Sequence, residues 1–98
     1  MLPIFFHPDT KVEVKESFTW YQLQSKGLGH EFVQELDEAF NSIQSLPSTW
    51  PKFGQSHRRF ILARFPFSII YKVRDNSEIY VVAVMHNHRK PEYWNERS

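Results

Sequence analysis

The chain has 98 residues, of which 41% are hydrophobic and 23% are charged, and its formal net charge at pH 7 is +1. This length and composition indicate one globular domain over residues 1–98, and the small net charge gives no reason to expect nucleic-acid or membrane binding through the field of the whole molecule. The absence of cysteine excludes a disulfide framework, a thiolate nucleophile and a thiolate metal site, and it fits a reducing compartment.

The apolar opening of the chain is short. Residues 1–6 are mostly apolar, but His7, Pro8 and Asp9 interrupt the run before it could form a signal peptide or a membrane span. We therefore expect a cytoplasmic protein that does not contact a membrane. Residues 4–7 are typical of a short strand, and Asp9 or Thr10 is available to cap a following helix.

Two helices joined by a glycine turn are predicted next. The first runs from residue 10 to about residue 26, and the second from about residue 29 to residue 46, where Pro47 ends it. The apolar positions of the first helix are Val14, Phe18 and Tyr21. Those of the second helix form a cleaner stripe: Phe32, Leu36, Ala39, Phe40, Ile43 and Leu46. So short a connection predicts an antiparallel helical hairpin that packs on a sheet.

Three strands are predicted after a loop over residues 48–55. They cover residues 58–65, 67–73 and 79–86, and their short connections predict an antiparallel meander. The last strand is apolar on both faces, which predicts an interior strand covered on both sides. Together with the first strand, this gives an α+β fold of order β-α-α-β-β-β, with a small, mainly antiparallel four-stranded sheet and a short C-terminal helix.

The end of the last predicted strand carries the residues most suited to chemistry. His86 and His88 point the same way in an extended chain, so the pair is a candidate general acid and base. The alternative is that His86 forms a hydrogen bond within the fold and holds the C-terminal turn. Neither a metal site nor a cofactor is predicted, because a zinc site needs three or four ligands.

An arginine and two aromatic residues follow this histidine pair. Tyr93 lies four residues after Arg89, so it can reach back over Arg89 and form a pair able to stack on a base or stabilise a phosphate. Trp94 is predicted to pin the tail to the sheet, because a terminal aromatic residue otherwise has no reason to become ordered.

Several segments together are distinctive. They are the opening Ile-Phe-Phe-His-Pro-Asp, the Trp20-Tyr21 pair, the turn Gly27-Leu28-Gly29-x-x-Phe32, the stretch from Arg59 through Arg64-Phe65-Pro66-Phe67 to Tyr71, and the ending from Ile79 to Arg97. Over essentially the whole chain, this set resembles the RelE/ParE toxin superfamily of bacterial type II toxin–antitoxin systems. The resemblance implies a helical hairpin packed on a small, mainly antiparallel sheet.

The resemblance leaves two mechanisms open. RelE-like toxins cleave mRNA on the ribosome, and under that alternative the catalytic residues would be Arg64, Arg89, Tyr93 and His86. ParE-like toxins poison DNA gyrase and are not established nucleases. The ending His86-x-x-Arg89-x-Pro91-x-Tyr93-Trp94 is more typical of the ParE-like branch, which we therefore favour. A third possibility is a degenerate toxin that retains only antitoxin binding.

The resemblance also implies a partner. A cognate antitoxin, ParD-like or another DNA-binding antitoxin, is expected to form a hetero-oligomer with the chain, and gyrase or the ribosome is the expected target. Aromatic residues make up 16% of the chain and are enriched at interfaces, which fits such a partner. The candidate partner-binding residues are Trp20, Arg59, His88, Trp94 and Arg97.

Overall fold

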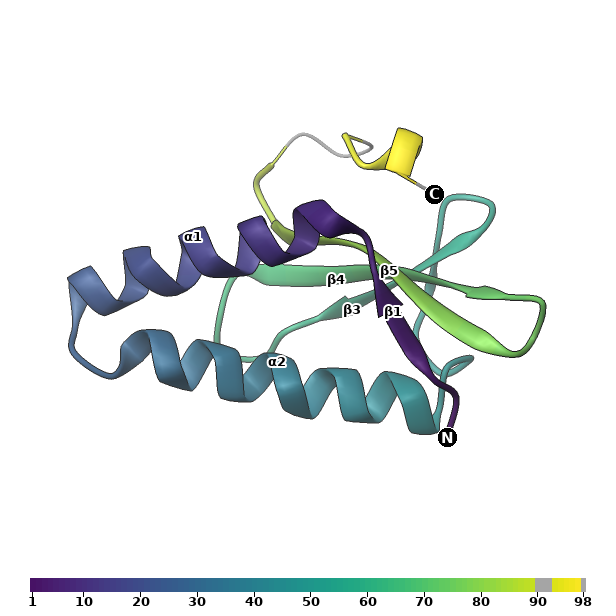
Figure 1. The fold of residues 1–98 in the computed structure, drawn as a ribbon, viewed down its shortest axis with the longest axis horizontal. Helices are drawn as coiled ribbons and strands as arrows, with labels where there is room; N and C mark the ends of the chain where they lie inside the picture. Colours follow the sequence, from purple (N-terminus) through teal and green to yellow (C-terminus); the bar gives the residue numbers. More distant parts are fainter. Residues whose placement is uncertain (90–92, 98) are drawn as a thin grey trace.

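Two helices lie on one face of a five-stranded sheet (Figure 1). The computed structural model describes residues 1–89 and 93–97. Its elements, in chain order, are β1 (Ile4–Phe6), α1 (Pro8–Gln24), α2 (Leu28–Ser45), β2 (Lys52–Phe53), β3 (His57–Ile61), β4 (Phe67–Arg74), β5 (Glu78–His86) and the 3-10 helix η1 (Asn95–Arg97). The predicted α+β architecture and helical hairpin are confirmed.

The strands are arranged in the order β1-β5-β4-β3-β2. β1 runs parallel to β5, and the other pairs are antiparallel. The sheet has five strands where four were expected, because Lys52 and Phe53 pair with β3 inside the predicted loop. A strand of two residues is too short to show the alternating pattern by which strands are recognised in a sequence.

β3 is shorter than predicted, because a side chain of α2 binds the backbone of the residues that follow the strand. The Glu35 carboxylate accepts the backbone N–H groups of Ala63 and Arg64 at 2.7 and 3.2 Å. These amides therefore bind a helix side chain, and residues 62–66 form a loop between β3 and β4. The apolar residues of this segment led to the prediction of a strand, but their side chains belong to the core: Leu62 and Phe65 are buried under α2.

α1 begins two residues earlier than predicted. His7 caps it, since its Nδ1 atom accepts the Asp9 N–H at 3.1 Å, and Pro8 occupies the first turn, where no backbone N–H is needed. Asp9 and Thr10 therefore lie inside the helix and are not its cap. The Thr10 hydroxyl donates to the His7 carbonyl at 2.7 Å.

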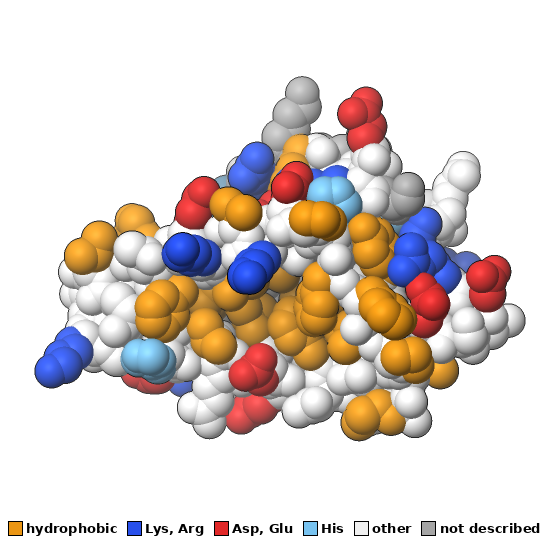
Figure 2. Space-filling view, in the orientation of Figure 1, with side chains coloured by type: hydrophobic (Ala, Val, Ile, Leu, Met, Phe, Trp, Pro, Cys, Tyr) orange, Lys and Arg blue, Asp and Glu red, His pale blue; other side chains and the backbone are white. Residues whose placement is uncertain are grey.

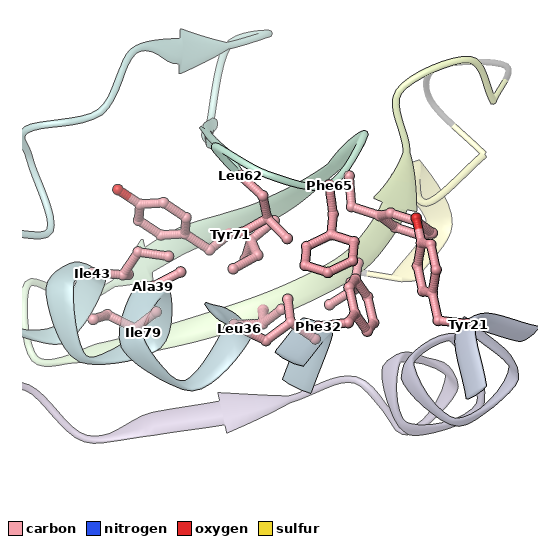
Figure 3. Packing of buried hydrophobic residues seen from close by; sticks show 13 residues of the cluster. Tyr21, Phe32, Leu36, Ala39, Ile43, Leu62, Phe65, Tyr71 and Ile79 are labelled. Carbon is pink, nitrogen blue, oxygen red and sulfur yellow. The ribbon is translucent and has the colours of Figure 1, made fainter. Parts of the chain in front are cut away.

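The main core lies between the helices and the sheet (Figure 3). Phe32, Leu36 and Ile43 project from α2 onto Tyr71 and Ile79 of the sheet, and all five are at most 1% exposed. At one end of the cluster the rings of Tyr21, Phe32 and Phe65 lie 4.9 to 5.3 Å apart between centroids, with two of the three contacts edge to face. Such geometry adds to the free energy gained by burying the rings.

A smaller core covers the other face of the sheet, where Ile70, Val82, Ala83, Met85 and Trp94 pack together. β5 contributes to both cores because its residues are apolar on both faces, and a register shift changes which positions face each core. Ala83 pairs with Ile70 but Val81 pairs with Tyr71, so Val82 is an extra residue that forms a β-bulge. The prediction that β5 is an interior strand covered on both faces is confirmed. No helix in the described ranges is long and apolar enough to cross a membrane.

We expect Gly29→Ala to destabilise the fold by about 1–2 kcal/mol, since overpacking outweighs the gain in helix propensity. A Cβ atom at Gly29 would lie 2.6 Å from the Phe18 carbonyl oxygen, so α1 and α2 would have to separate. The measurement is urea denaturation. Gln34→Ala, at an exposed position of α2, is the control and should change stability by less than about 0.5 kcal/mol. Equal stability of Gly29→Ala and the control would contradict the close packing.

Candidate functional site

The edge of β5 that faces β1 is only partly covered by a strand. β1 pairs with Ile79, Tyr80 and Val81 and ends at Phe6. The last backbone hydrogen bond on this edge runs from the His7 N–H to the Val81 carbonyl at 2.9 Å, after which α1 leads the chain away. The next backbone groups of β5 on this edge therefore need other partners.

Glu13 of α1 and Arg97 of η1 supply those partners. One carboxylate oxygen of Glu13, Oε1, accepts the Val84 N–H at 3.0 Å. The other, Oε2, accepts the Arg97 Nη1–H at 3.0 Å, and the same nitrogen donates to the Val82 carbonyl at 3.1 Å. The Glu13 and Arg97 side chains are only 13% and 15% exposed, so the pair is strong and costly to break.

Tyr93 completes this arrangement, which we call the Glu13 network: Glu13, Tyr93, Arg97 and the backbone of Val82 and Val84. The Tyr93 hydroxyl donates to Glu13 Oε2 at 2.6 Å. The guanidinium groups of Arg89 and Arg97 lie 4.0 and 4.9 Å from the centre of the Tyr93 ring. Burial raises the pKa of Tyr93 well above its usual value, and the hydrogen bond and charge of Glu13 raise it further. The phenol is therefore neutral, and its hydroxyl group already donates a hydrogen bond to Glu13.

Trp94 lies buried on the face of the sheet opposite the helices. It is 2% exposed, and its ring centre lies 4.7 Å from that of His57 and 5.9 Å from that of Phe53. Burial lowers the pKa of His57, and the charge of Lys72 lowers it further. This is the position expected of a residue that pins the tail. A direct partner contact by Trp94 stays a prediction and would require the tail to move.

His86 and His88 form a second cluster at the end of β5. Their ring centres lie 5.3 Å apart, and His86 Nδ1 accepts the backbone N–H of His88 at 3.1 Å. Since Nδ1 is an acceptor, a neutral His86 carries its proton on Nε2. His88 and the neighbouring Arg89 are exposed.

The structure separates Arg64 from these residues. Arg64 follows β3, and its Nη2 atom donates to Glu31 of α2 at 2.6 Å in an exposed ion pair. Among the described residues, no hydrogen bond, ion pair or ring contact links Arg64 to His86, Arg89 or Tyr93. Three of the four residues of the nuclease alternative therefore lie near the end of β5, and the fourth lies in the loop between β3 and β4, paired with α2. Their catalytic role stays a prediction.

The remaining partner-binding candidates differ in accessibility. Arg59 is held on the face opposite the helices, where its Nε donates to Ser68 Oγ at 2.8 Å and its Nη2 to Asn87 Oδ1 at 3.2 Å. Arg97 is held in the Glu13 network. Trp20 is 58% exposed and borders an apolar pocket of about 550 Å³ with Phe67 and His86.

An apolar groove lies between the two helices. Its volume is about 680 Å³, and its lining includes Phe6, Val14, Phe18, Val33 and Phe40. Figure 2 shows hydrophobic side chains gathered in the hollow between α1 and α2, with basic side chains along the α1 border. Lys11 and Lys15 belong to this lining. The groove therefore suits an apolar segment that carries negative charge on one side.

Three residues that matter here were not found from the sequence. Along the chain Glu13 is one of several polar positions of the first helix, and its partners Val84 and Arg97 lie 71 and 84 residues away. Ser68 and Asn87 are joined by a hydrogen bond of 2.6 Å. No spacing rule connects such distant positions. Within the described part of the chain, no group of three or more histidine or carboxylate side chains is placed to hold a metal ion.

Comparison with known proteins adds a family and a structural relative. A protein-family model described as "ParE toxin of type II toxin-antitoxin system, parDE" matches residues 4–91. The chain is also similar to a solved structure titled "Chromosomal ParDE TA system from P. aeruginosa", with a TM-score of 0.77 and 18% identity over 88% of this chain and 96% of that chain. At this identity, the likeness concerns the fold. No curated protein matches the chain.

We expect Glu13→Ala to destabilise the protein by about 3–5 kcal/mol, because it leaves a buried arginine, a phenol and a backbone amide without their shared acceptor. Urea denaturation measures the loss, and hydrogen exchange should show reduced protection of the Val84 amide. Glu38→Ala is the matched control, since Glu38 is an exposed glutamate of α2, and it should be nearly neutral. Unchanged protection at Val84 would contradict the role given to Glu13.

The raised pKa of Tyr93 predicts a loss of stability in alkali. Above the ordinary tyrosine pKa of 10.0, the unfolded chain releases the phenolic proton before the folded chain does, so the free energy of unfolding falls as pH rises. Tyr93→Phe should cost about 1–2 kcal/mol at neutral pH and progressively less above pH 10. Burial also raises the pKa of Tyr71, to about 12, so part of the alkaline slope should remain in the variant. Parallel pH profiles of the two proteins would be inconsistent with this coupling.

Proposed function

The chain belongs to the ParE toxin family of type II toxin–antitoxin systems, and we propose that it inhibits growth by poisoning DNA gyrase and is neutralised by a cognate antitoxin. The resemblance to RelE/ParE toxins, with the ParE-like branch favoured, is confirmed by the family match over residues 4–91. The choice of gyrase as target and the identity of the antitoxin are the proposed part.

The observation that carries the choice of mechanism is the state of Tyr93. A general acid or base must exchange its proton near neutral pH, and it must be free to meet the substrate. The Tyr93 hydroxyl donates to the mostly buried Glu13, and its pKa is raised. Arg64 is paired with Glu31 on α2. This arrangement supports a protein-binding inhibitor over a ribosome-dependent nuclease.

The groove between α1 and α2 supports binding of an antitoxin. A ParD-like or other DNA-binding antitoxin would place the apolar side of an amphipathic segment against Val14, Phe18 and Phe40 and its acidic side near Lys11 and Lys15. Binding only the folded toxin would stabilise it by mass action. The complex would be a hetero-oligomer, and the proposed target and partner place its action in the cytoplasm.

The nuclease alternative retains one specific observation in its favour. His86, His88 and Arg89 are neighbours at one corner of the molecule, where His88 and Arg89 are exposed. A ribosome-dependent mRNA cleavage assay separates the two candidates. The gyrase proposal predicts no cleavage above background, whereas cleavage that disappears in His86→Ala and Arg89→Ala would favour the nuclease.

We expect the purified chain to convert gyrase into a DNA-breaking complex. Incubation with gyrase, supercoiled plasmid and ATP, followed by detergent and protease, should yield linear plasmid, and prior addition of the antitoxin should prevent it. Induction in cells should cause filamentation and DNA damage before translation falls. Unchanged supercoiling activity and no linear plasmid at a molar excess of the chain would refute gyrase as the target.

A further inference from the structure

The outer edge of β3 is covered by β2 over only part of its length. β2 pairs with the start of β3, and the last backbone bond on this side runs from the Arg59 N–H to the Pro51 carbonyl at 3.0 Å. Because strand residues alternate, the N–H and carbonyl of Ile61 point to the same edge, and within the described part of the chain no hydrogen bond reaches them. Glu35 covers only the next position on this edge, the Ala63 N–H. The edge is therefore open at Ile61.

The pocket on the helix side of this edge is acidic. Its volume is about 450 Å³, and its lining includes Ile61 and three glutamates of α2, namely Glu31, Glu35 and Glu38. Arg64 pairs with Glu31 at 2.6 Å, but the exposed Glu38 has no ion-pair partner among the described residues. Three carboxylates beside one arginine make this side of the edge suited to a basic side chain.

The pocket on the opposite side of the edge is mainly apolar. Its volume is about 310 Å³, and Trp50 and Phe53 contribute rings to its lining. Ile61 lines this pocket too, and its side chain is 57% exposed. Strand edges that must stay unpaired carry charged residues or proline, whereas an exposed isoleucine leaves the edge open to pairing. Lys52 and Arg59 share the lining and repel a further cation, so this side suits an apolar side chain.

An open strand edge between two pockets can take an extended peptide by strand addition. Backbone hydrogen bonds then supply affinity, and pockets that receive alternate side chains supply specificity. A residue placed opposite Ile61 would exchange two hydrogen bonds with it and lay its own side chain on the apolar pocket. The residues before and after it would point to the other face, toward the acidic pocket.

We propose that this edge binds an extended segment of a partner protein, in which an apolar residue opposite Ile61 is flanked on both sides by lysine or arginine. The carboxylates of α2 would repel a nucleic-acid backbone. A second copy of this chain does not match, because its Ile61 is flanked by Phe60 and Leu62, whose side chains pack in their own core. The site lies on the side of α2 opposite Val33 and Phe40, which line the groove between the helices, so it does not depend on the proposed function.

A short peptide of this pattern tests the site. The probe is acetyl-Thr-Lys-Val-Lys-Thr-amide, and the matched control is acetyl-Thr-Glu-Val-Glu-Thr-amide. In an NMR titration of the isotope-labelled full chain, the lysine peptide should shift the amide signals of Ile61 and Ala63, with a Kd of about 1 mM or lower. The glutamate peptide should bind at least about tenfold more weakly. Equal binding of the two peptides, or no shift at Ile61, would overturn the proposal.

A charge reversal tests the acidic pocket. Glu38→Lys should weaken binding of the lysine peptide by about fivefold or more, because an attraction becomes a repulsion. Asp37→Lys is the matched control, since Asp37 is an exposed carboxylate of α2 that does not line the pocket, and it should bind like the wild type. Equal losses in the two variants would mean that the peptide responds only to overall charge, which would refute the docking site.

A methyl group on the backbone nitrogen of the central valine tests the strand pairing. That nitrogen would donate to the Ile61 carbonyl, so its methylation should abolish binding. Methylation of the following lysine nitrogen, which would point away from β3, should have little effect. Equal binding of the two methylated peptides would contradict the pairing. An Ile61 amide signal that moves with the concentration of the chain alone would assign the edge to a second copy and would also overturn the proposal.

Discussion

The carboxylate of Glu13 is the constraint on which the C-terminal end of this molecule depends. Once β1 gives way to α1, the edge of β5 has lost its neighbouring strand, and Glu13 and Arg97 bind the exposed backbone groups in its place. One side chain thereby links the first helix, the middle of the sheet and the C-terminal segment. A buried backbone amide without a partner costs too much free energy to be tolerated, which explains why a charged residue is retained at a mostly buried position.

This link also determines what the C-terminal aromatic residues can do. Tyr93 is held by Glu13, and Trp94 fills the small core on the opposite face of the sheet. Tyr93 and Trp94 are thus both held within the fold, and the catalytic role of His86, Arg89 and Tyr93 stays a prediction. Among the described residues at the end of β5, His88 and Arg89 are exposed and His86 is partly buried.

α1 presents different chemistry on different sides. One side packs into the main core through Tyr21, and the flank lined by Val14 and Phe18 borders the groove between the helices (Figure 2). The outward side carries Val12, Trp20 and Leu23. A helix that is apolar on several sides is unusual in a small monomeric protein, but it is typical of a protein that binds partners through that helix.

The sequence by itself determined the helical hairpin, the three long strands and the family, because these depend on local periodicity and on motifs that are contiguous in the chain. It did not determine β2, which is too short to show a period, or the end of β3, where the carboxylate of Glu35 replaces strand pairing. Only the tertiary structure decided which polar residues meet. Glu13 and Arg97 are 84 residues apart, and Arg64 binds α2 and stays apart from Tyr93. Such pairings follow from the path of the backbone in three dimensions, and no spacing along the chain encodes them.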